Sequence, residues 1–238
     1  MRKFTVKEIK ERFDNDVERF SSLEIGQTTT VDAVLAMDLI TQAAAITSPK
    51  ASHILDVGCG AGNYTLKLLE RLPNVDVTLV DLSKPMLERA HERISNVSSG
   101  EINLIQGDIR EIDLDDDCYD IVMAAAVLHH LRDESEWEAV FKKIYHSLRY
   151  GGGFWVFDLI EHSIPVIQSL MWRRYGDYLV DFKDEEFREL VYGYIIKEDT
   201  PKPLLYQIDM MRKVGFAGQT ILHKNLCYAA FGAIKVLN

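Results

Sequence analysis

The sequence has few cysteines and no long apolar run. Its three cysteines, Cys59, Cys118 and Cys227, are far apart in 238 residues, and none lies in a CxxC pair. This spacing indicates neither a disulfide framework nor a zinc site, so we expect small buried side chains in a reducing compartment and no metal. No window approaches the roughly 18 apolar residues of a membrane span. The charged N-terminal segment also lacks the apolar core of a signal peptide, so we expect a cytoplasmic protein without a membrane partner.

Positive charge is also scarce. The chain has 27 Lys and Arg against 37 Asp and Glu, which gives a net charge of −10 and a pI near 5.2. Nonspecific binding to a phosphate backbone relies on clustered Lys and Arg, so nucleic acid is a disfavoured partner, though not an excluded one. The one local basic patch, Trp172–Tyr175, is typical of a solvated helix face. A small molecule is the expected partner.

The first 50 residues are expected to form a helical cap. Ile9, Phe13, Val17 and Phe20 recur at helical spacing, which predicts one amphipathic helix from residue 6 to about residue 20. A second helix is predicted from residue 31 to about residue 46. We expect Thr30 to cap it and Asp32 to lie in its first turn, near the positive end of the helix dipole.

Residues 51–238 are predicted to form an α/β domain with a doubly wound, mostly parallel sheet. Short apolar runs alternate with amphipathic segments, the order that produces parallel strands with helices on both faces. A further helix and a closing antiparallel pair of strands follow the insertion, so seven strands are expected in all. A charged, aromatic stretch, about 159–202, breaks the rhythm and is predicted to be a helical insertion over the C-terminal edge of the sheet. The predicted strands are 53–57, 75–81, 102–106, 121–125, 154–157, 218–226 and 228–237, and the closing helix is 203–214.

The segment "GCGAG", residues 58–62, directly follows the first predicted strand. In a doubly wound sheet the ligand lies at the C-terminal ends of the strands, and the first strand-to-helix turn lines its site. Glycines there adopt backbone angles closed to other residues and let a ligand approach the main chain. Asn63 stands where the dinucleotide fingerprint has its third glycine, which disfavours NAD and FAD. We expect an adenosine-bearing ligand; the alternative is a tight turn with no ligand.

Acidic residues follow the next two strands. Asp81 lies about 20 residues beyond the turn, where a carboxylate can accept hydrogen bonds from both hydroxyls of a ribose. Ser83 can cap the following helix, which leaves Asp81 free for a ligand. Asp108 can accept from an exocyclic amine while the backbone at Ile109 contacts the ring. The alternative for Asp108 is that it caps a turn.

Four segments resemble, in order and spacing, the cofactor motifs of the class I S-adenosylmethionine-dependent methyltransferases. They are "LDVGCGAGNYTLKLL", "VDLSKPMLERA", "QGDIREIDL" and "YDIVMAAAVLHHL". "LRYGGGFWVFD" is similar to the turn before that family's fifth strand, except that Tyr150 stands where members commonly have proline, which affects turn stiffness more than chemistry. The resemblance implies a Rossmann-like methyltransferase fold, S-adenosylmethionine as cofactor and methyl transfer to a small-molecule acceptor.

The resemblance also implies which residues contact the cofactor. The glycine turn would contact its methionine part, Asp81 its ribose and Asp108 with Ile109 its adenine, while the loop 124–129 would lie beside the sulfonium. The expected cofactor-binding residues are Asp56, Gly58, Cys59, Gly60, Gly62, Asn63, Asp81, Leu82, Met86, Asp108, Ile109, Ala124 and Ala125.

Methyl transfer is an in-line displacement, so positioning in a water-poor site matters most. If the acceptor is a hydroxyl or a protonated amine, a base must take its proton. His129 and His130 are the candidate catalytic residues, and only one need face the site. The alternative is one packed and one surface histidine. The insertion 159–202 is expected to wall the acceptor pocket as a lid, although core packing suits each of its aromatic residues.

Three other functions compete. "FDNDVERF" and the C-terminal "LHKNLCYAAFGAIKVL" are also similar to the carboxy-S-adenosylmethionine synthase branch, which acts in tRNA wobble-uridine modification. Those enzymes recognise a carboxylated cofactor with a basic residue, for which Arg212 is the candidate here. The second is a non-catalytic S-adenosylmethionine-binding module, and the third is an NAD-dependent oxidoreductase, which Asn63 disfavours.

Overall fold

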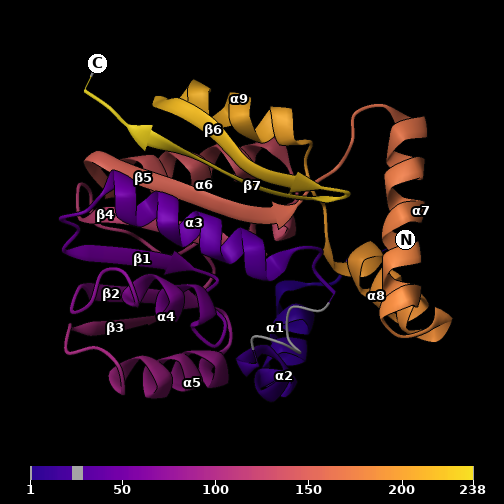
Figure 1. Cartoon of the computed structure of the whole chain (residues 1–238), viewed down its shortest axis with the longest axis horizontal. Helices are drawn as coiled ribbons and strands as arrows, with labels where there is room; N and C mark the ends of the chain where they lie inside the picture. The colour runs from indigo at the N-terminus through magenta and orange to yellow at the C-terminus, as the bar shows by residue number, and fades with distance from the viewer. Residues whose placement is uncertain (1, 23–28, 238) are drawn as a thin grey trace.

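A computed structural model describes residues 2–22 and 29–237 of the chain. Its centre is a seven-stranded sheet in the order β3-β2-β1-β4-β5-β7-β6 (Figure 1). β1 to β5 run parallel, and β7 pairs antiparallel with both β5 and β6. The predicted doubly wound, mostly parallel sheet is confirmed. The strands are β1 His53–Val57, β2 Asp76–Asp81, β3 Ile102–Gln106, β4 Tyr119–Ala125, β5 Leu148–Leu159, β6 Phe216–Asn225 and β7 Tyr228–Lys235.

Helices cover both faces of this sheet and create two apolar cores. On one face, α3 (Ala33–Thr47), α4 (Asn63–Leu69) and α5 (Lys84–Ser95) pack over the strands. On the other face, α6 (Glu134–Ser147) and α9 (Leu204–Val214) bury Trp137 and Phe141. The crossover from β3 to β4 changes faces, which makes β1 and β4 the neighbours between which the chain order reverses. A doubly wound sheet binds its ligand at this switch point.

The N-terminal cap differs from the predicted single helix. α1 (Val6–Asn15) ends before Asp16, and a separate short helix, α2 (Val17–Ser21), follows it. α1 begins with a capping box: Glu8 N–H donates to Thr5 Oγ1 at 3.3 Å, and Thr5 N–H donates to a Glu8 carboxylate oxygen at 2.8 Å. This reciprocal pair satisfies two free N–H groups at the helix start. Both helices contact α5.

The start of α3 was also predicted incorrectly. Thr30 does not cap this helix, which begins at Ala33, and Asp32 is the residue before it rather than part of its first turn. Asp32 has a left-handed backbone, with a φ of 56°. Its carboxylate accepts from His223 and from Asn225 of β6, both at 2.8 Å. Long-range hydrogen bonds to the sheet therefore decide where this helix begins.

The insertion forms two helices that extend past the end of the sheet: α7 (Pro165–Phe182) and α8 (Glu185–Glu198) (Figure 1). Its aromatic side chains pack on one another, as the core-packing alternative expected. Trp172 stacks on Tyr192 at 4.6 Å between ring centroids, and the Tyr192 hydroxyl donates to the Trp172 carbonyl. Tyr175 is fully buried against Tyr228 of β7, which joins the insertion to the sheet.

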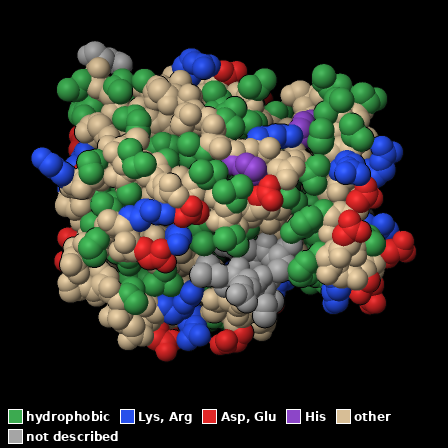
Figure 2. All heavy atoms as spheres, in the orientation of Figure 1, with side chains coloured by type: hydrophobic (Ala, Val, Ile, Leu, Met, Phe, Trp, Pro, Cys, Tyr) green, Lys and Arg blue, Asp and Glu red, His purple; other side chains and the backbone are tan. Residues whose placement is uncertain are grey.

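Charged residues of both signs are mixed on the face that Figure 2 shows. Lys and Arg side chains lie among Asp and Glu side chains there rather than in one patch, consistent with the low expectation of nucleic-acid binding. No helix in the described part of the chain has the length and apolarity needed to cross a membrane.

Candidate functional site

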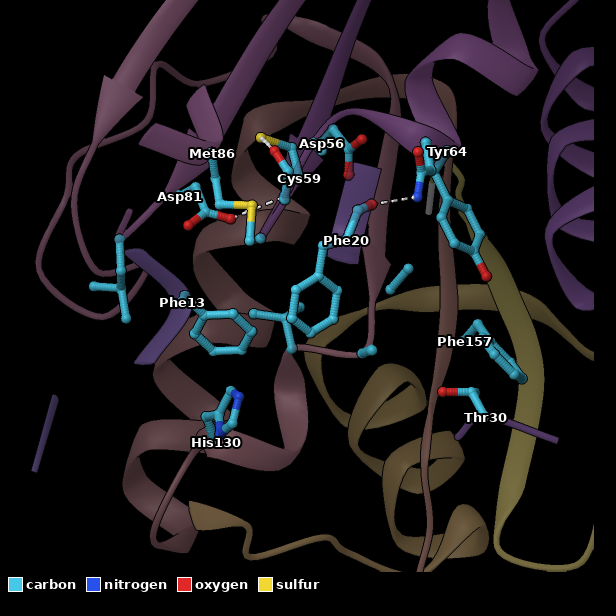
Figure 3. Close-up of a pocket in the computed structure, with 18 of the residues that line it drawn as sticks. Phe13, Phe20, Thr30, Asp56, Cys59, Tyr64, Asp81, Met86, His130 and Phe157 are labelled. Atoms are coloured by element: carbon cyan, nitrogen blue, oxygen red, sulfur yellow. Dashed lines mark hydrogen bonds between the residues drawn. The ribbon is translucent and has the colours of Figure 1, made fainter. Parts of the chain in front are cut away.

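A pocket opens at the C-terminal ends of β1, β2 and β4, at the switch point (Figure 3). The space inside it, counting the open solvent at its mouth, is ≈ 960 Å³. Its walls come from the glycine turn, the loop after β4 and the N-terminal helices. The lining residues are Phe13, Phe20, Thr30, Ala33, Asp56, Gly58, Cys59, Gly60, Ala61, Asn63, Tyr64, Asp81, Leu82, Met86, Ala125, Ala126, Val127, His130 and Phe157.

The three glycines of the turn share a left-handed backbone but differ in what surrounds them. Their φ values are 67°, 51° and 80° at Gly58, Gly60 and Gly62, in the left-handed region that favours glycine. A Cβ on Gly58 would lie 2.6 Å from Val127, and one on Gly62 would lie 3.1 Å from Ile94. A Cβ on Gly60 would meet nothing within 4 Å. Two of the glycines therefore permit close packing, while Gly60 exposes backbone to the pocket.

Two carboxylates point into the pocket region. Asp81 accepts from Gly60 N–H at 2.9 Å and from Ser83 N–H at 2.8 Å, so it also shapes the turn. Enclosure among protein atoms raises the pKa of Asp81 to about 6, against the opposing effect of these backbone donors. Asp56 accepts from the Thr65 hydroxyl at 2.7 Å. Burial, with a smaller contribution from the charge of Asp81, raises its pKa to about 6 as well.

The charge of this pocket selects among ligands. Asp56 and Asp81 line it, and no Lys or Arg does among the described residues. A pyrophosphate would bring two negative charges beside these carboxylates, whereas a sulfonium with an α-amino group brings positive charge. The residues present thus fit S-adenosylmethionine and do not fit a dinucleotide.

A smaller pocket adjoins the first one and shares Gly58, Asp81, Leu82, Val127 and His130 with it. Asp108 and Ile109 line this smaller pocket, where the sequence placed the adenine.

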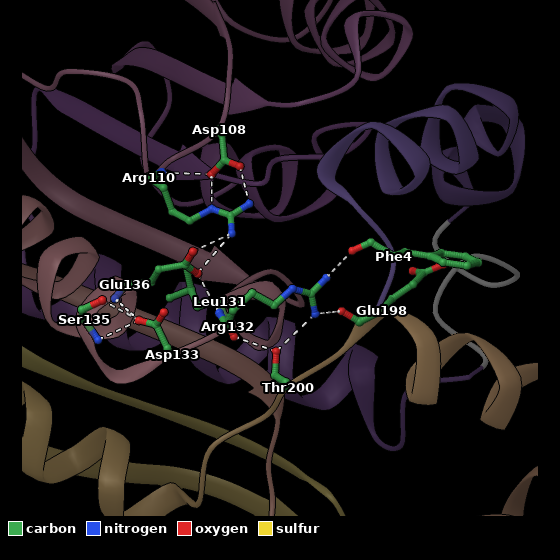
Figure 4. Close-up of polar contacts among 10 residues, drawn as sticks. All are labelled: Phe4, Asp108, Arg110, Leu131, Arg132, Asp133, Ser135, Glu136, Glu198 and Thr200. Atoms are coloured by element: carbon green, nitrogen blue, oxygen red, sulfur yellow. Dashed lines mark hydrogen bonds and ion pairs between the residues drawn. The ribbon is translucent and has the colours of Figure 1, made fainter. Parts of the chain in front are cut away.

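Asp108 is not free in the structure, because Arg110 binds both of its oxygens. Arg110 donates through its guanidinium at 2.9 Å and 2.5 Å and through its backbone N–H at 3.0 Å (Figure 4). The turn-capping alternative for Asp108 is therefore realised. An adenine amine would have to share the carboxylate with Arg110.

The two candidate catalytic histidines lie in different environments. His130 lines both pockets, and its ring meets Phe13 edge-on at 6.1 Å between centroids. His129 lines neither of them and binds Asp158 through Nδ1. Burial lowers the pKa of His129, but the charges of Asp158 and Asp199 outweigh this effect and raise it to about 9. His129 therefore holds its proton at neutral pH and is unsuited to act as a base, as expected if only one histidine faces the site.

Most of the predicted cofactor-binding residues are brought together by the fold, but two are not. Gly62 faces α5 instead of the pocket, and Ala124 is fully buried within β4. Sequence reasoning singled out none of several aromatic and apolar residues of the wall as site residues: Phe13 and Phe20 lie on the N-terminal helices outside the motifs, and the other three lie within the quoted motifs, where only packing shows that they face the pocket. These are Phe13, Phe20, Tyr64, Val127 and Phe157.

The helices that close the pocket are α1 and α2, not the insertion. Phe13 and Phe20 lie 5.4 Å apart between centroids and form the wall opposite the sheet. Asn63, the residue that departs from the dinucleotide fingerprint, donates to the Phe20 carbonyl at 3.0 Å and so ties α2 to the glycine turn. No described residue of the segment 159–202 lines this pocket, so its role as a lid stays a prediction.

Arg212 also lies outside both pockets. It pairs with Asp209 at 2.5 Å on the exposed side of α9, with 60% of its side chain exposed. It cannot hold a carboxylate of a ligand in the pocket, so the carboxy-S-adenosylmethionine synthase alternative loses its candidate residue.

Comparison with known proteins identifies the domain. Residues 54–152 match the family model described as "Methyltransferase domain". Malonyl-[acyl-carrier protein] O-methyltransferase 1 of Ilyobacter polytropus is 33% identical over 105 residues, which are 44% of this chain and 37% of that protein. Demethylmenaquinone methyltransferase of Listeria monocytogenes is 27% identical over 117 residues, covering 49% of this chain and 48% of that protein. The chain thus spans less than half the length of the curated relatives it matches.

Solved structures share the fold over nearly the whole chain. A possible S-adenosylmethionine-dependent methyltransferase of Methanococcus maripaludis aligns with a TM-score of 0.60 and 16% identity, covering 100% of this chain and 97% of that one. Human N-acetylserotonin methyltransferase, solved with S-adenosylmethionine, has a TM-score of 0.60 at 18% identity and covers 95% of this chain and 57% of that one. The Rossmann-like methyltransferase fold is confirmed.

Proposed function

Since residues 54–152 form a methyltransferase domain of the class I S-adenosylmethionine-dependent kind, we propose that the chain transfers a methyl group from S-adenosylmethionine to a small-molecule acceptor. One observation carries this proposal: at the switch point of the sheet, the pocket combines a backbone-exposing glycine with two carboxylates and no lining Lys or Arg among the described residues. This combination suits an adenosyl amino acid that carries positive charge.

Different residues of the chain would contact different parts of S-adenosylmethionine. Asp81 would accept hydrogen bonds from the ribose hydroxyls, and Gly60 would let the ligand approach the main chain. Leu82 and Met86 would provide apolar contact, while Asp56 would favour the positive end of the ligand. When bound, S-adenosylmethionine supplies an electrophilic methyl group.

The acceptor would enter at the end of the pocket where Phe13, Phe20, Phe157 and His130 lie. Aromatic walls exclude water there, which favours an in-line displacement between well-positioned reactants. His130 is the histidine placed to contact the acceptor, and an imidazole there can take the proton of a hydroxyl or an amine. His129 would fix the loop through Asp158.

The first test is isothermal titration calorimetry with S-adenosylmethionine and, separately, with NAD. We expect one S-adenosylmethionine to bind per chain and NAD not to bind. His130→Ala should leave the cofactor affinity within about threefold, since the expected cofactor contacts come from the glycine turn and β2, but should slow methylation of any acceptor found. Absence of S-adenosylmethionine binding, after removal of copurified ligand, would refute the proposed function.

Cofactor affinity should also depend on pH. The pKa of Asp81 is about 6, so its carboxylate is largely ionised at neutral pH and becomes protonated as the pH falls. A protonated Asp81 loses the charge that favours the ligand, so the affinity for S-adenosylmethionine should fall about tenfold between roughly pH 7 and pH 5. Calorimetry across this range measures the change, and Asp81→Asn should reduce the pH dependence. An affinity that stays constant in the wild type would contradict the assignment of Asp81.

A further inference from the structure

Two histidines and an aspartate meet beside the pocket, although they come from distant parts of the chain. His129 and His130 lie in the short 3-10 helix η1 (Leu128–His130), and Asp199 directly follows α8. Asp199 Oδ1 lies 3.2 Å from Nδ1 of His130 and 3.6 Å from Nε2 of His129. One ligand atom from each of the three residues lies within 4.8 Å of the other two. The cluster is enclosed, since only 9% of the Asp199 side chain is exposed.

Three polar atoms of this cluster are buried without a hydrogen-bond partner among the described residues. They are both ring nitrogens of His130 and Oδ1 of Asp199. Nδ1 of His130 and Oδ1 of Asp199 contact each other at an ion-pair distance of 3.2 Å. Buried polar atoms are nearly always paired, so a group of unpaired ones needs an explanation. Two of these atoms, His130 Nδ1 and Asp199 Oδ1, lie together with Nε2 of His129, and such a group of imidazole and carboxylate lone pairs can bind a metal ion.

The surrounding hydrogen bonds hold the histidine side of the cluster in place. Asp158 binds Nδ1 of His129 and also accepts from its backbone N–H at 3.0 Å. The other ring nitrogen, Nε2, therefore faces Asp199. A carboxylate that fixes the far nitrogen of a histidine in this way is the usual support of a metal-binding imidazole.

The segment that carries Asp199 is fixed as well. Thr200 N–H donates to the His129 carbonyl at 2.7 Å. Arg132 donates to the Thr200 hydroxyl at 3.2 Å, to the Phe4 carbonyl at 2.9 Å and to the Glu198 carbonyl (Figure 4). These bonds clamp the backbone on both sides of Asp199, so its carboxylate is presented to the histidines by a rigid frame.

The Lys3 ammonium donates to the Asp199 backbone carbonyl, but no Arg or Lys of the described chain forms an ion pair with the Asp199 carboxylate. Within the described chain, the ion pairs of Asp199 are with His129 and His130 alone. The neighbouring Arg12 is engaged by Glu198 at 2.6 Å. Asp158 and Asp199 thus place two carboxylates beside the two imidazoles, and a divalent cation bound there would displace the proton that His129 holds in the metal-free protein.

We propose that His129 Nε2, His130 Nδ1 and Asp199 Oδ1 bind one divalent first-row transition-metal ion at the acceptor end of the pocket. An ion held at about 2.0–2.2 Å keeps neighbouring ligand atoms roughly 3.0–3.5 Å apart, close to the two distances from Asp199. Two imidazoles and one carboxylate suit zinc, iron, cobalt or nickel better than magnesium or calcium, which prefer oxygen ligands. Three protein ligands leave a coordination position open, as in catalytic rather than structural sites.

Metal binding would change His130 from a proton acceptor into a hydrogen-bond donor. With Nδ1 bound to the metal, Nε2 carries the ring proton and donates a hydrogen bond. Proton removal by His130 then belongs to the metal-free protein, and an acceptor in the metal-loaded protein would meet a hydrogen-bond donor. The sequence alone indicated no metal site because the histidine pair has no third ligand nearby in the chain.

The test uses the full chain without a histidine tag, stripped with chelator and titrated with Zn²⁺, Co²⁺ and Mg²⁺ at about pH 8 and again at a higher pH, since the ion must displace the proton that His129 holds in the metal-free protein. We expect one Zn²⁺ or Co²⁺ per chain and much weaker Mg²⁺ binding. His130→Gln and Asp199→Asn should each weaken Zn²⁺ binding at least about tenfold. The exposed His91→Ala is the matched control and should bind Zn²⁺ like the wild type.

Two further measurements keep the outcomes distinct. Circular dichroism verifies that each variant is folded, and X-ray absorption of the Zn²⁺-loaded wild type counts imidazole ligands without any variant. Failure to bind either transition ion, fewer than two imidazole ligands, or unchanged Zn²⁺ binding in both folded variants would overturn the proposal. S-adenosylmethionine is titrated in parallel: if it binds while metal does not, only the metal site is refuted, and the reverse result refutes only the proposed function.

Discussion

Asp81→Ala should reduce the affinity for S-adenosylmethionine by roughly a hundredfold. A hydrogen bond to a charged group contributes about 1.5–3 kcal/mol, and each 1.4 kcal/mol corresponds to tenfold in affinity, so the loss of two ribose contacts accounts for the effect. The same carboxylate accepts from the N–H groups of Gly60 and Ser83, so the substitution also loosens the glycine turn. Calorimetry on the purified variant measures the loss directly.

Two further variants distinguish the loss of the ribose contacts from the loosening of the glycine turn. Asp81→Asn keeps an oxygen that can accept from one backbone N–H and should have an intermediate affinity. Asp76→Asn is the matched control, because this exposed residue begins the same strand and its carboxylate accepts from Glu101 N–H at 2.8 Å, far from the pocket. We expect wild-type affinity for it. Equal affinity in Asp81→Ala and the wild type would remove Asp81 from the site.

Gly58→Ala should lower the free energy of unfolding by about 2–4 kcal/mol, because backbone strain and overpacking add. The φ of 67° at Gly58 disfavours any residue with a Cβ. The new methyl group would lie 2.6 Å from Val127 Cγ2, and Val127 is a stiff β-branched residue of the pocket wall. A shift of Val127 would also distort the pocket, so cofactor affinity should fall together with stability. Urea unfolding followed by circular dichroism measures the change.

Gly193→Ala is the control for this substitution. Gly193 lies within α8, and a Cβ there would meet nothing within 4 Å. Alanine is the better helix former, so this variant should gain about 0.5–1 kcal/mol. If Gly58→Ala were as stable as the wild type, the close packing between the glycine turn and the loop after β4 would be wrong.

The switch-point pocket explains why the chain keeps its acidic residues where it does. Asp56 and Asp81 both have a pKa near 6, raised by burial. Their ionised forms are costly in the free protein, and a cationic ligand relieves that cost. On the proposed function, this burial of two carboxylates would favour a positively charged ligand over a dinucleotide.

The sequence by itself determined the sheet, the glycine turn and the acidic residue at the end of β2. These features are local: alternating apolar runs fix the strands, and glycine and serine chemistry fixes the turn and the start of α5, where Ser83 caps the helix by accepting from Met86 N–H. Local periodicity and turn chemistry act over a few residues, so a single sequence is enough to predict them.

Tertiary structure alone decided the contacts between distant segments. The closure of the pocket by Phe13 and Phe20, the pairing of Asp32 with β6 and the meeting of Asp199 with the two histidines all depend on which elements pack together. The rotamer of Arg110 likewise decides that Asp108 is engaged by its own neighbour. Sequence periodicity gives the face of a helix but not the partner of that face, because the partner is chosen by packing and long-range hydrogen bonds that the local pattern does not contain.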